Sequence, residues 1–295
     1  MDFSLTQALL ASAPSAFSQA TQSAFLSRAA QGHVPKSLLG TWLANDRLYI
    51  HAYIRAIGRQ LSLLALPVAV PLAPAADAVL GPVAPKATPN ERLLKWLIDA
   101  LVNIHREEAF FVDTARRYGI KINLPTDDAG HVPAAAKLEG LVRFEALFDG
   151  LAPPPPPPQQ QHTGDHRQAT GAGTGKGLPW LEFAVVLWGT ERCYLEAWTG
   201  AARAQQQQQQ QHRSEVASSE AQDLDGGALR REFIPNWTSA EFVEFVDVLG
   251  EILDDAVREE MRRSGEGAAS EILKRAMVKW RELLDAETTF WPAMP

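Results

Sequence analysis

Residues 42–49 read Trp-Leu-Ala-Asn-Asp-Arg-Leu-Tyr and lie within a longer segment, residues 37–66, whose apolar side chains recur at steps of three and four. This spacing places the apolar side chains on one face of an α-helix, whereas a half-buried strand would alternate apolar and polar residues. The apolar positions on this face are Leu39, Trp42, Leu43, Tyr49, Tyr53 and Ile57. The segment therefore predicts a long amphipathic helix.

Helical spacing extends through most of the chain, and alternation of period two is almost absent. The sequence Thr88-Pro89-Asn90-Glu91 has the pattern of a capping box, and it predicts a helix to about residue 118 that ends at Gly119. A second capping pattern, at residues 238–241, predicts a helix to about residue 263. Further helices are predicted over residues 15–31, 134–148, 178–204 and 270–290. Seven helices without a sheet indicate an all-α bundle.

Three stretches of low complexity interrupt this pattern, over residues 67–87, 153–177 and 205–227. The first is rich in Pro and Ala, the second contains six prolines, and the third begins with a run of Gln. Because these compositions offer no periodic apolar face, we expect flexible, solvent-exposed loops inserted into one fold. The prediction is therefore a single domain over residues 1–295.

The composition is typical of a globular protein, with 46% hydrophobic and 8% aromatic residues. The net charge of -7 argues against binding to nucleic-acid phosphates or to an anionic membrane surface. The longest apolar stretch, residues 61–80, is interrupted by three prolines and by Asp77, so it does not predict a membrane-spanning helix. No basic segment typical of a secretory signal opens the chain. We therefore expect a soluble, cytoplasmic protein with no nucleic-acid and no membrane partner.

Metal and haem cofactors are not expected. Cys193 is the only cysteine, which excludes a multi-thiolate zinc site and an intramolecular disulfide. Of the seven histidines, only His51 and His105 lie on predicted helices, too few for a histidine-rich metal site. The predicted site therefore has no metal and no organic cofactor.

Asp46 is a candidate functional residue because it shares a helix face with Tyr49 and Tyr53. Acids among aromatic side chains tend to have shifted pKa values, as functional acids do. Two interpretations are open: the carboxylate lies in a pocket, or it pairs with a cation such as Arg47 or Arg192. A second polar and aromatic stripe, formed by Asn103, Glu107 and Phe110, is interpreted as ordinary bundle packing.

Three groups of residues follow one another in an order that is typical of one protein family. The first group is residues 23–26 (SAFL), 32–35 (GHVP) and 42–49, the second is residues 187–198 (LWGTERCYLEAW), and the third is residues 236–242 (NWTSAEF) and 287–291 (ETTFW). Together they resemble the TenA (thiaminase II) family of the haem-oxygenase-like all-helical superfamily. The resemblance covers nearly the whole chain outside the low-complexity stretches. It implies a haem-oxygenase-like helical bundle, and it allows a homo-oligomer, because members are often oligomeric.

The resemblance also assigns roles to individual side chains. In that family an aspartate on the second long helix holds the aminopyrimidine ring of the substrate, and Asp46 matches it. A carboxylate suits this role because it accepts hydrogen bonds from an amino group and a protonated ring nitrogen in one plane. Tyr49 matches a tyrosine that lines the pocket. The late glutamate of the family matches Glu287, and Phe290 and Trp291 are expected on the same helix face.

The central helix departs from the family pattern. Typical members have a catalytic cysteine four residues before the tyrosine that Tyr194 matches, and here that position is Thr190. Cys193 lies about 60° around the helix from Thr190, and we expect a core residue there instead of a nucleophile. A branch of the family that lacks the cysteine has Trp-x-x-Glu-x-x-Tyr at this place, and this chain resembles that branch, with Glu191 as the glutamate. Glu191 either faces the pocket or is a buried structural acid bonded to a tyrosine.

The resemblance implies a cofactor-free hydrolase that acts on a thiamine-derived aminopyrimidine or a related amide, as in pyrimidine salvage. Asp46, Tyr49 and Tyr194 are then the substrate-binding residues, and Glu287 and Glu191 are the catalytic acids and bases. The alternative is a non-catalytic helical-bundle protein that binds a ligand or regulates thiamine metabolism. The missing cysteine favours this alternative, and the three acids among aromatic residues oppose it.

Overall fold

The computed structural model describes residues 3–66, 68, 87–151, 178–214 and 223–294, and every regular element in these ranges is helical. The all-α prediction is therefore confirmed. The helices are α1 (Leu5–Ser12), α2 (Pro14–Thr21), α3 (Ala24–Ala30), α4 (Lys36–Leu61), α5 (Pro89–Tyr118), α6 (Glu139–Gly150), α7 (Leu181–Ser214), α8 (Ile234–Asn236), α9 (Ala240–Ser264) and α10 (Glu266–Thr288). A 3-10 turn, Ala134–Ala136, precedes α6, and a π-helical turn, Leu229–Phe233, precedes α8.

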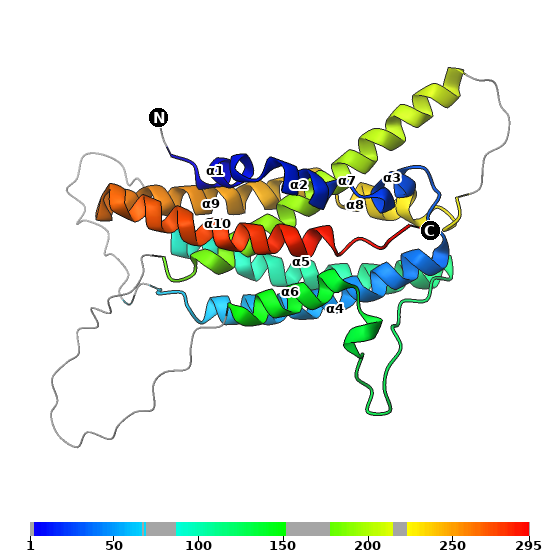
Figure 1. The fold of residues 1–295 in the computed structure, drawn as a ribbon, viewed down its shortest axis with the longest axis horizontal. Coiled ribbons are helices and arrows are strands. Elements are labelled where there is room, and N and C mark those ends of the chain that lie inside the picture. Colours follow the sequence, from blue (N-terminus) through cyan, green and yellow to red (C-terminus); the bar gives the residue numbers. More distant parts are fainter. Residues whose placement is uncertain (1–2, 67, 69–86, 152–177, 215–222, 295) are drawn as a thin grey trace, which may run out of the picture.

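The long helices lie side by side in one bundle (Figure 1). Helix α4 packs against α5 and α6, and α5 packs against α9. Helix α7 contacts α2, α3, α9 and α10, so it lies in the bundle centre. No helix of the described residues combines the length and the apolar character needed to cross a membrane.

The two ends of α5 follow from its own sequence. Thr88 accepts a hydrogen bond from the backbone N–H of Glu91, and the Glu91 carboxylate accepts one from the N–H of Thr88, which completes the capping box. At the other end, Gly119 has φ 65°, a left-handed conformation that glycine adopts without steric cost. Both predicted ends are confirmed.

Two predicted helices are shorter than expected because hydrogen bonds to short polar side chains define where they begin. The helix predicted over residues 15–31 is divided, since Ser23 leaves the helical conformation and caps α3. The helix predicted from residue 134 begins five residues later. Just before its first residue, the backbone N–H of Leu138 donates to Oδ1 of Asn45 at 2.8 Å. Short polar side chains compete with the helix for backbone groups, and here they define its boundaries.

The predicted capping box at residues 238–241 is wrong. The N-cap of α9 is Ser239, which accepts from the N–H of Phe242 at 3.2 Å. Thr238 instead donates its hydroxyl to the backbone oxygen of Ile234 at 2.8 Å. Because the residue three positions after Ser239 is Phe242, no carboxylate bonds back to the cap.

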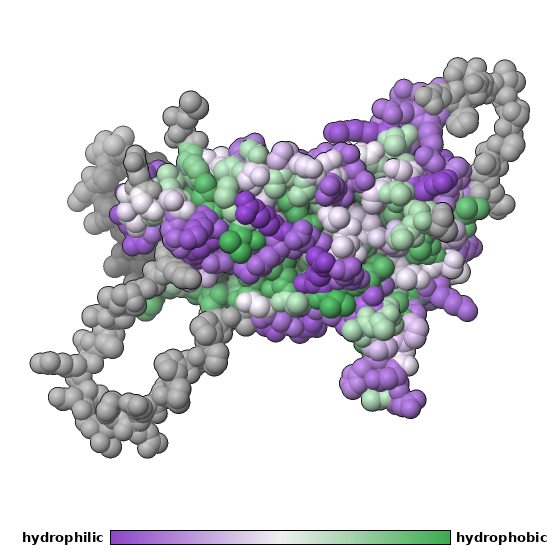
Figure 2. All heavy atoms as spheres, viewed as in Figure 1, coloured by the Kyte–Doolittle hydropathy of each residue, from purple (hydrophilic) through white to green (hydrophobic). Residues whose placement is uncertain are grey.

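Helix α7 extends further than predicted. Residues 205–214 of the third low-complexity stretch continue the helix instead of forming a loop. Glutamine has a high helix propensity, and lengthening an existing helix is easier than starting one. This end projects from the bundle, and the surface around it is hydrophilic (Figures 1 and 2). The stretch 153–177 and nearly all of 67–87 lie outside the described residues, so their predicted flexibility stays a prediction.

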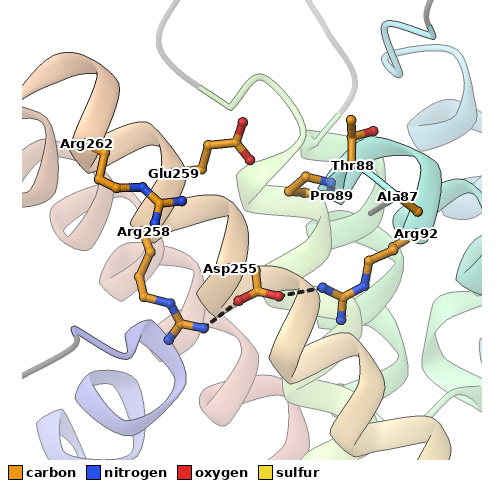
Figure 3. Close-up of a pocket in the computed structure, with 8 residues that line it drawn as sticks. All are labelled: Ala87, Thr88, Pro89, Arg92, Asp255, Arg258, Glu259 and Arg262. Atoms are coloured by element: carbon orange, nitrogen blue, oxygen red, sulfur yellow. Dashed lines mark hydrogen bonds and ion pairs between the residues drawn. The ribbon is translucent and has the colours of Figure 1, made fainter. Parts of the chain in front are cut away.

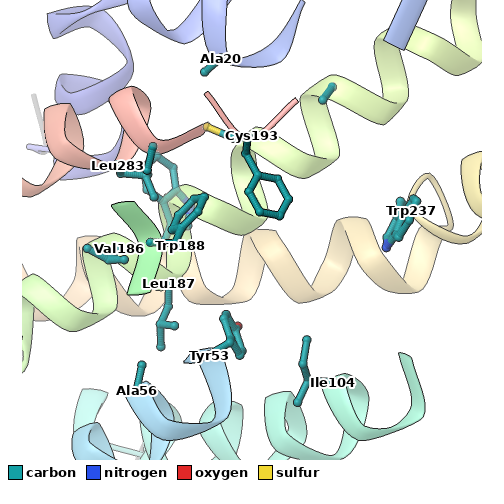
Figure 4. Packing of buried hydrophobic residues seen from close by; sticks show 14 of the residues in the cluster. Ala20, Tyr53, Ala56, Ile104, Val186, Leu187, Trp188, Cys193, Trp237 and Leu283 are labelled. Carbon is teal, nitrogen blue, oxygen red and sulfur yellow. The ribbon is translucent and has the colours of Figure 1, made fainter. Parts of the chain in front are cut away.

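Aromatic side chains fill the end of the bundle that holds the candidate site. The ring of Trp42 lies between 5.3 and 5.9 Å from four other rings, those of Phe25, Trp198, Trp237 and Trp291. Figure 4 shows Tyr53, Cys193 and Trp237 among the packed residues of this core. This packing fixes the helices that carry the site, because a close-packed interior leaves few alternative side-chain positions.

Candidate active site

Four carboxylic acids from four different helices meet in the bundle interior. Asp46 lies on α4, Glu107 on α5, Glu191 on α7 and Glu287 on α10. Asp46 and Glu287 are 3% and 1% exposed, whereas Glu107 and Glu191 are half-buried. Asp46, Glu107 and Glu191 line one cavity of about 30 Å³. The other lining residues are Tyr49, Ile50, Ile104, Thr190, Tyr194, Trp237 and Phe242.

Each of the three acids that line the cavity accepts a hydrogen bond from an aromatic side chain. The pairs are Tyr194 with Oδ2 of Asp46 at 2.8 Å, Tyr53 with Oε1 of Glu191 at 2.6 Å, and Nε1 of Trp237 with Oε1 of Glu107 at 2.5 Å. Phenol and indole donors are neutral, so they orient the carboxylates without cancelling their charge. The cavity therefore keeps its acidic character.

No Lys or Arg is among the described residues that line the cavity. Arg47 binds Glu108 at 3.1 Å, and Arg192 binds Glu196 at 2.9 Å, so neither of these cations pairs with Asp46. The geometry therefore favours the pocket interpretation of Asp46. Both interpretations of Glu191 apply, because it lines the cavity and is bonded to a tyrosine.

Burial without a counter-ion raises the pKa values of the acids. Burial raises the pKa of Glu191 to about 8, with a smaller increase from Glu107, although the hydrogen bond from Tyr53 opposes both. Burial raises the pKa of Glu107 to about 7, against the hydrogen bond from Trp237. Burial, followed by the charge of Glu107, raises the pKa of Asp46 well above its usual range. Carboxyl groups with such pKa values can exchange protons at neutral pH.

Glu287 lies in the last turn of α10, beside the cavity but not among its lining residues. Its Oε2 is buried and has no hydrogen-bond partner among the described residues. Burial, followed by the charges of Asp46 and Glu191, raises the pKa of Glu287 well above its usual range. A buried carboxyl oxygen without a partner costs free energy, so it marks a place where a water molecule or a ligand donor fits.

The segment after α10 is packed against the site. Helix α10 ends before Phe290 and Trp291, so the prediction that these rings share a helix face with Glu287 is wrong. The Phe290 ring nevertheless lies 5.8 Å from that of Tyr49, and the Trp291 ring stacks on Tyr194 at 6.0 Å. The helix stops early, but its aromatic continuation still surrounds the substrate-binding candidates.

Thr190 and Cys193 take the positions expected from the sequence. Thr190 lines the cavity, and its hydroxyl donates to the backbone oxygen of Leu187 at 3.0 Å. Cys193 is 1% exposed, and burial raises the pKa of its thiol well above the usual range. The prediction that Cys193 is a core residue is confirmed, and its neutral thiol is a poor nucleophile.

Glu107 is the acid of the cavity that the sequence pattern did not identify. From the sequence it is interpreted as ordinary bundle packing, whereas the structure places its carboxylate in the wall of the cavity. The helix periodicity does indicate an inward position for Glu107. It lies three residues after Ile104 and four before Phe111, and both of these are buried. A glutamate on the buried face of a helix has to find a donor or a ligand.

A larger hollow, of about 300 Å³, opens at the surface between the start of α5 and α9 (Figure 3). Asp255 on α9 binds Arg92 on α5 at 2.5 Å across this hollow, and it binds Arg258 of its own helix at 2.6 Å. None of its described lining residues has a buried polar atom without a partner. The charged groups in these ion pairs are already neutralised by their partners. The aromatic cavity is therefore the candidate site.

Comparison with known proteins identifies the fold. No protein-family model matches the sequence. The solved structure of a TenA homologue from Pyrococcus furiosus is similar, with a TM-score of 0.57 and 18% sequence identity over 97% of this chain and 98% of that chain. The chain has the fold of a TenA homologue. The predicted haem-oxygenase-like all-α fold is therefore confirmed, and at this identity the likeness concerns the fold alone.

One relative in sequence comes from Fusarium pseudograminearum (strain CS3096) and is named "Probable transcription factor". It is 24% identical over 312 aligned residues, which include 97% of this chain. The chain spans about half of the length of that relative, 52%. Nearly half of the relative thus lies outside the comparison.

Proposed function

We propose that the protein is a TenA-like hydrolase that acts on a thiamine-derived aminopyrimidine or a related amide, by acid and base catalysis without a cofactor. The cavity carries this proposal, because Asp46, Glu191, Tyr49 and Tyr194 line it together and no Lys or Arg of the described part of the chain lines it with them. A flat, basic nitrogen heterocycle complements such a cavity. It presents N–H donors at its edge and apolar faces to the aromatic walls.

Asp46 is the proposed anchor of the ring. Tyr194 occupies Oδ2 of the carboxylate, which leaves Oδ1 for an amino group or a ring N–H of the ligand. Such a charge-assisted hydrogen bond is stronger than one between neutral groups. Tyr49 lies one turn further along α4 and packs edge-on against Phe144 at 5.0 Å, so its ring forms part of a rigid apolar wall.

Hydrolysis of an amide C–N bond requires that water loses a proton and that the departing nitrogen gains one. In the proposed mechanism the Glu191 carboxylate takes the proton of a water molecule, and the water oxygen attacks the carbon. Glu287 gives its proton to the nitrogen as the C–N bond breaks. A proton then passes from Glu191 to Glu287 and restores the starting state. A bound cationic ring lowers the pKa of Glu191 and so favours its ionised form.

The cavity must widen before a ring enters. Its volume of about 30 Å³ is enough for water. Ligand sites usually measure roughly 300–1,000 Å³. Half-buried lining side chains must therefore move. Phe242 is one of them, and it lies in the first turn of α9, where a helix opens most readily.

A ligand-binding or regulatory protein of thiamine metabolism is the second candidate function. Thr190 occupies the place of the family nucleophile, and its hydroxyl is bound within its own helix. The Fusarium relative is named a transcription factor, which also favours a regulatory role. On this alternative the cavity binds the same aminopyrimidine without converting it.

Incubation of the protein with formylaminopyrimidine and with thiamine distinguishes the two functions. Chromatography measures the product, and titration calorimetry measures binding of the same compounds. Product formation supports the hydrolase. Saturable binding without product supports the regulatory protein, and the absence of both contradicts both candidates.

A further inference from the structure

One end of the bundle concentrates positively charged side chains. It is formed by α3, the start of α4, the end of α5 with the residues after it, the π-helical turn before α8 and the projecting end of α7 (Figure 1). The net charge of -7 is a sum over the whole chain, so it does not exclude a basic surface at one end. Five exposed cations lie there, and their side chains form no ion pair or hydrogen bond with other described residues: Arg28, Lys36, Lys121, Arg203 and Arg231.

The turn at residues 223–227 brings two of these cations together. Gly226 and Gly227 have φ values of 80° and 94°, a backbone conformation that glycine adopts without steric cost. A Cβ atom on Gly226 would lie 3.7 Å from Nζ of Lys36, and one on Gly227 would lie 3.0 Å from Nε of Arg231. The charged ends of Lys36 and Arg231 therefore lie beside adjacent residues of one turn, although they come from elements far apart in the sequence.

The projecting end of α7 leaves the bundle at the same place. Nε2 of Gln205 donates to the backbone oxygen of Arg230 at 3.5 Å, so the helix passes the π-helical turn that carries Arg231. Residues 203–210 read Arg-Ala-Gln-Gln-Gln-Gln-Gln-Gln, and Arg203, Gln206 and the side chains at 207 and 209 are exposed. This part of the helix has a polar surface without an acid, so it does not repel a polyanion.

We propose that this end of the bundle binds double-stranded DNA, with the projecting end of α7 in the major groove and the cations on the phosphates beside it. An α-helix with its side chains measures about 10–12 Å across, and the major groove of B-DNA is about 12 Å wide, so the helix fits. Glutamine amides donate to and accept from base edges, whereas Lys and Arg neutralise phosphates. Double-stranded RNA does not fit, because its major groove is too narrow for side chains to read.

This surface is separate from the proposed hydrolytic site. None of the five cations is among the described residues that line the aromatic cavity. The expectation that the protein has no nucleic-acid partner rests on its net charge, and phosphate binding depends instead on the local charge of the surface that meets the DNA. Loss of DNA binding and loss of hydrolysis are therefore independent outcomes.

Fluorescence anisotropy over a series of NaCl concentrations tests the inference. The probe is a labelled DNA duplex of about 20 base pairs, or two helical turns. The logarithm of the association constant should fall with the logarithm of the salt concentration by about 0.9 for each phosphate that is neutralised, so five cations predict a slope of up to about -4.5. Arg231→Gln removes one cation and should reduce this slope by about 0.9. Arg262→Gln is the matched control and should leave the slope unchanged, because Arg262 is an exposed arginine at the opposite end of the bundle, beside the start of α5 (Figure 3).

Variants of the projecting helix test its place in the groove. Glu at both 206 and 207, as Gln206→Glu with Gln207→Glu, should weaken DNA binding at least about tenfold, and Gln206→Lys should strengthen it, because both side chains are exposed and only the charge changes. Circular dichroism checks that each variant is folded. The inference is overturned by absence of DNA binding at low salt, by equal effects of Arg231→Gln and Arg262→Gln, or by helix variants that bind like the wild type. Tighter binding of a double-stranded RNA of equal length, or of poly-glutamate, also overturns it.

Discussion

Tyr194 on α7 donates a hydrogen bond to Asp46 on α4 at 2.8 Å. The same two helices form a second tyrosine–acid bond, in which the tyrosine comes from α4 and the acid from α7. Tyr53 on α4 donates to Glu191 on α7 at 2.6 Å. Each helix thus contributes one acid and one tyrosine, and both acids are fixed by neutral donors. Because no Lys or Arg among the described residues lines this cavity, the arrangement leaves the positive charge to the ligand.

The first prediction concerns Asp46. Replacement by Asn keeps the shape but removes a charge-assisted acceptor, so binding of an aminopyrimidine should weaken about ten- to a hundred-fold. Titration calorimetry measures this change. Asp99→Asn is the control, because the Asp99 side chain is 49% exposed and pairs with Lys95. Equal affinity of the Asp46→Asn variant and the wild type would show that Asp46 does not hold the ring.

The second prediction concerns the pH dependence of stability. The pKa of Glu191 rises from the usual 4.5 to about 8 on folding, because burial disfavours the charged form. The folded state therefore binds this proton more tightly than the unfolded chain. Its contribution to stability is complete below pH 4.5 and is lost as the pH rises towards 8.

Thermal denaturation at pH 5 and pH 8 tests this second prediction. Glu191→Gln removes the titrating group, so its Tm should fall less than that of the wild type between the two pH values. At pH 8 the variant should be more stable by a few degrees, since 1 kcal/mol corresponds to roughly 2–4 °C in a domain of this size. A wild-type protein that gains stability over the variant as the pH rises contradicts the assignment.

The third prediction concerns Gly140, which lets α6 approach the chain just beyond α10. A Cβ atom at this position would lie 2.4 Å from the backbone nitrogen of Phe290 and 2.6 Å from the backbone oxygen of Ala286. Backbone atoms cannot yield easily, so Gly140→Ala should destabilise the fold by about 1–3 kcal/mol. In Gly150→Ala, at the end of α6, the added Cβ meets nothing within 4 Å, and we expect an unchanged or raised Tm. Equal Tm values for the two variants would refute this packing argument.

The fourth prediction concerns the lone cysteine. Cys193 is buried, its thiol is held neutral, and it is not among the residues that line the cavity. Cys193→Ser should therefore keep turnover of formylaminopyrimidine within a few-fold of the wild type. A folded variant without activity would point to a cysteine nucleophile instead.

Local features of the fold could be predicted from the sequence because their causes lie within a few residues. The capping box at Thr88 and the left-handed Gly119 define α5 by themselves. The shared face of Asp46 and Tyr53 follows from helix periodicity alone, and both side chains do reach α7. Short-range geometry is thus sufficient for the helix ends and for the inward face.

Other features depend on partners far away in the chain. The role of Glu107 is defined by Trp237, 130 residues later, and no spacing rule connects the two. Similarly, the start of α6 depends on Asn45, 93 residues before the N–H that it binds. The helical conformation of the Gln run is different, because it follows from the helix that precedes it, whereas composition alone favoured a loop.

The most direct test of the proposed acid–base hydrolysis is the turnover of formylaminopyrimidine by the wild type and by Glu287→Gln, with binding measured in parallel. The wild type should release product. The variant should lose about 10²–10⁴-fold in turnover while its affinity changes little, because general acid–base catalysis acts mainly in the transition state. A folded Glu287→Gln variant with wild-type turnover would contradict the account.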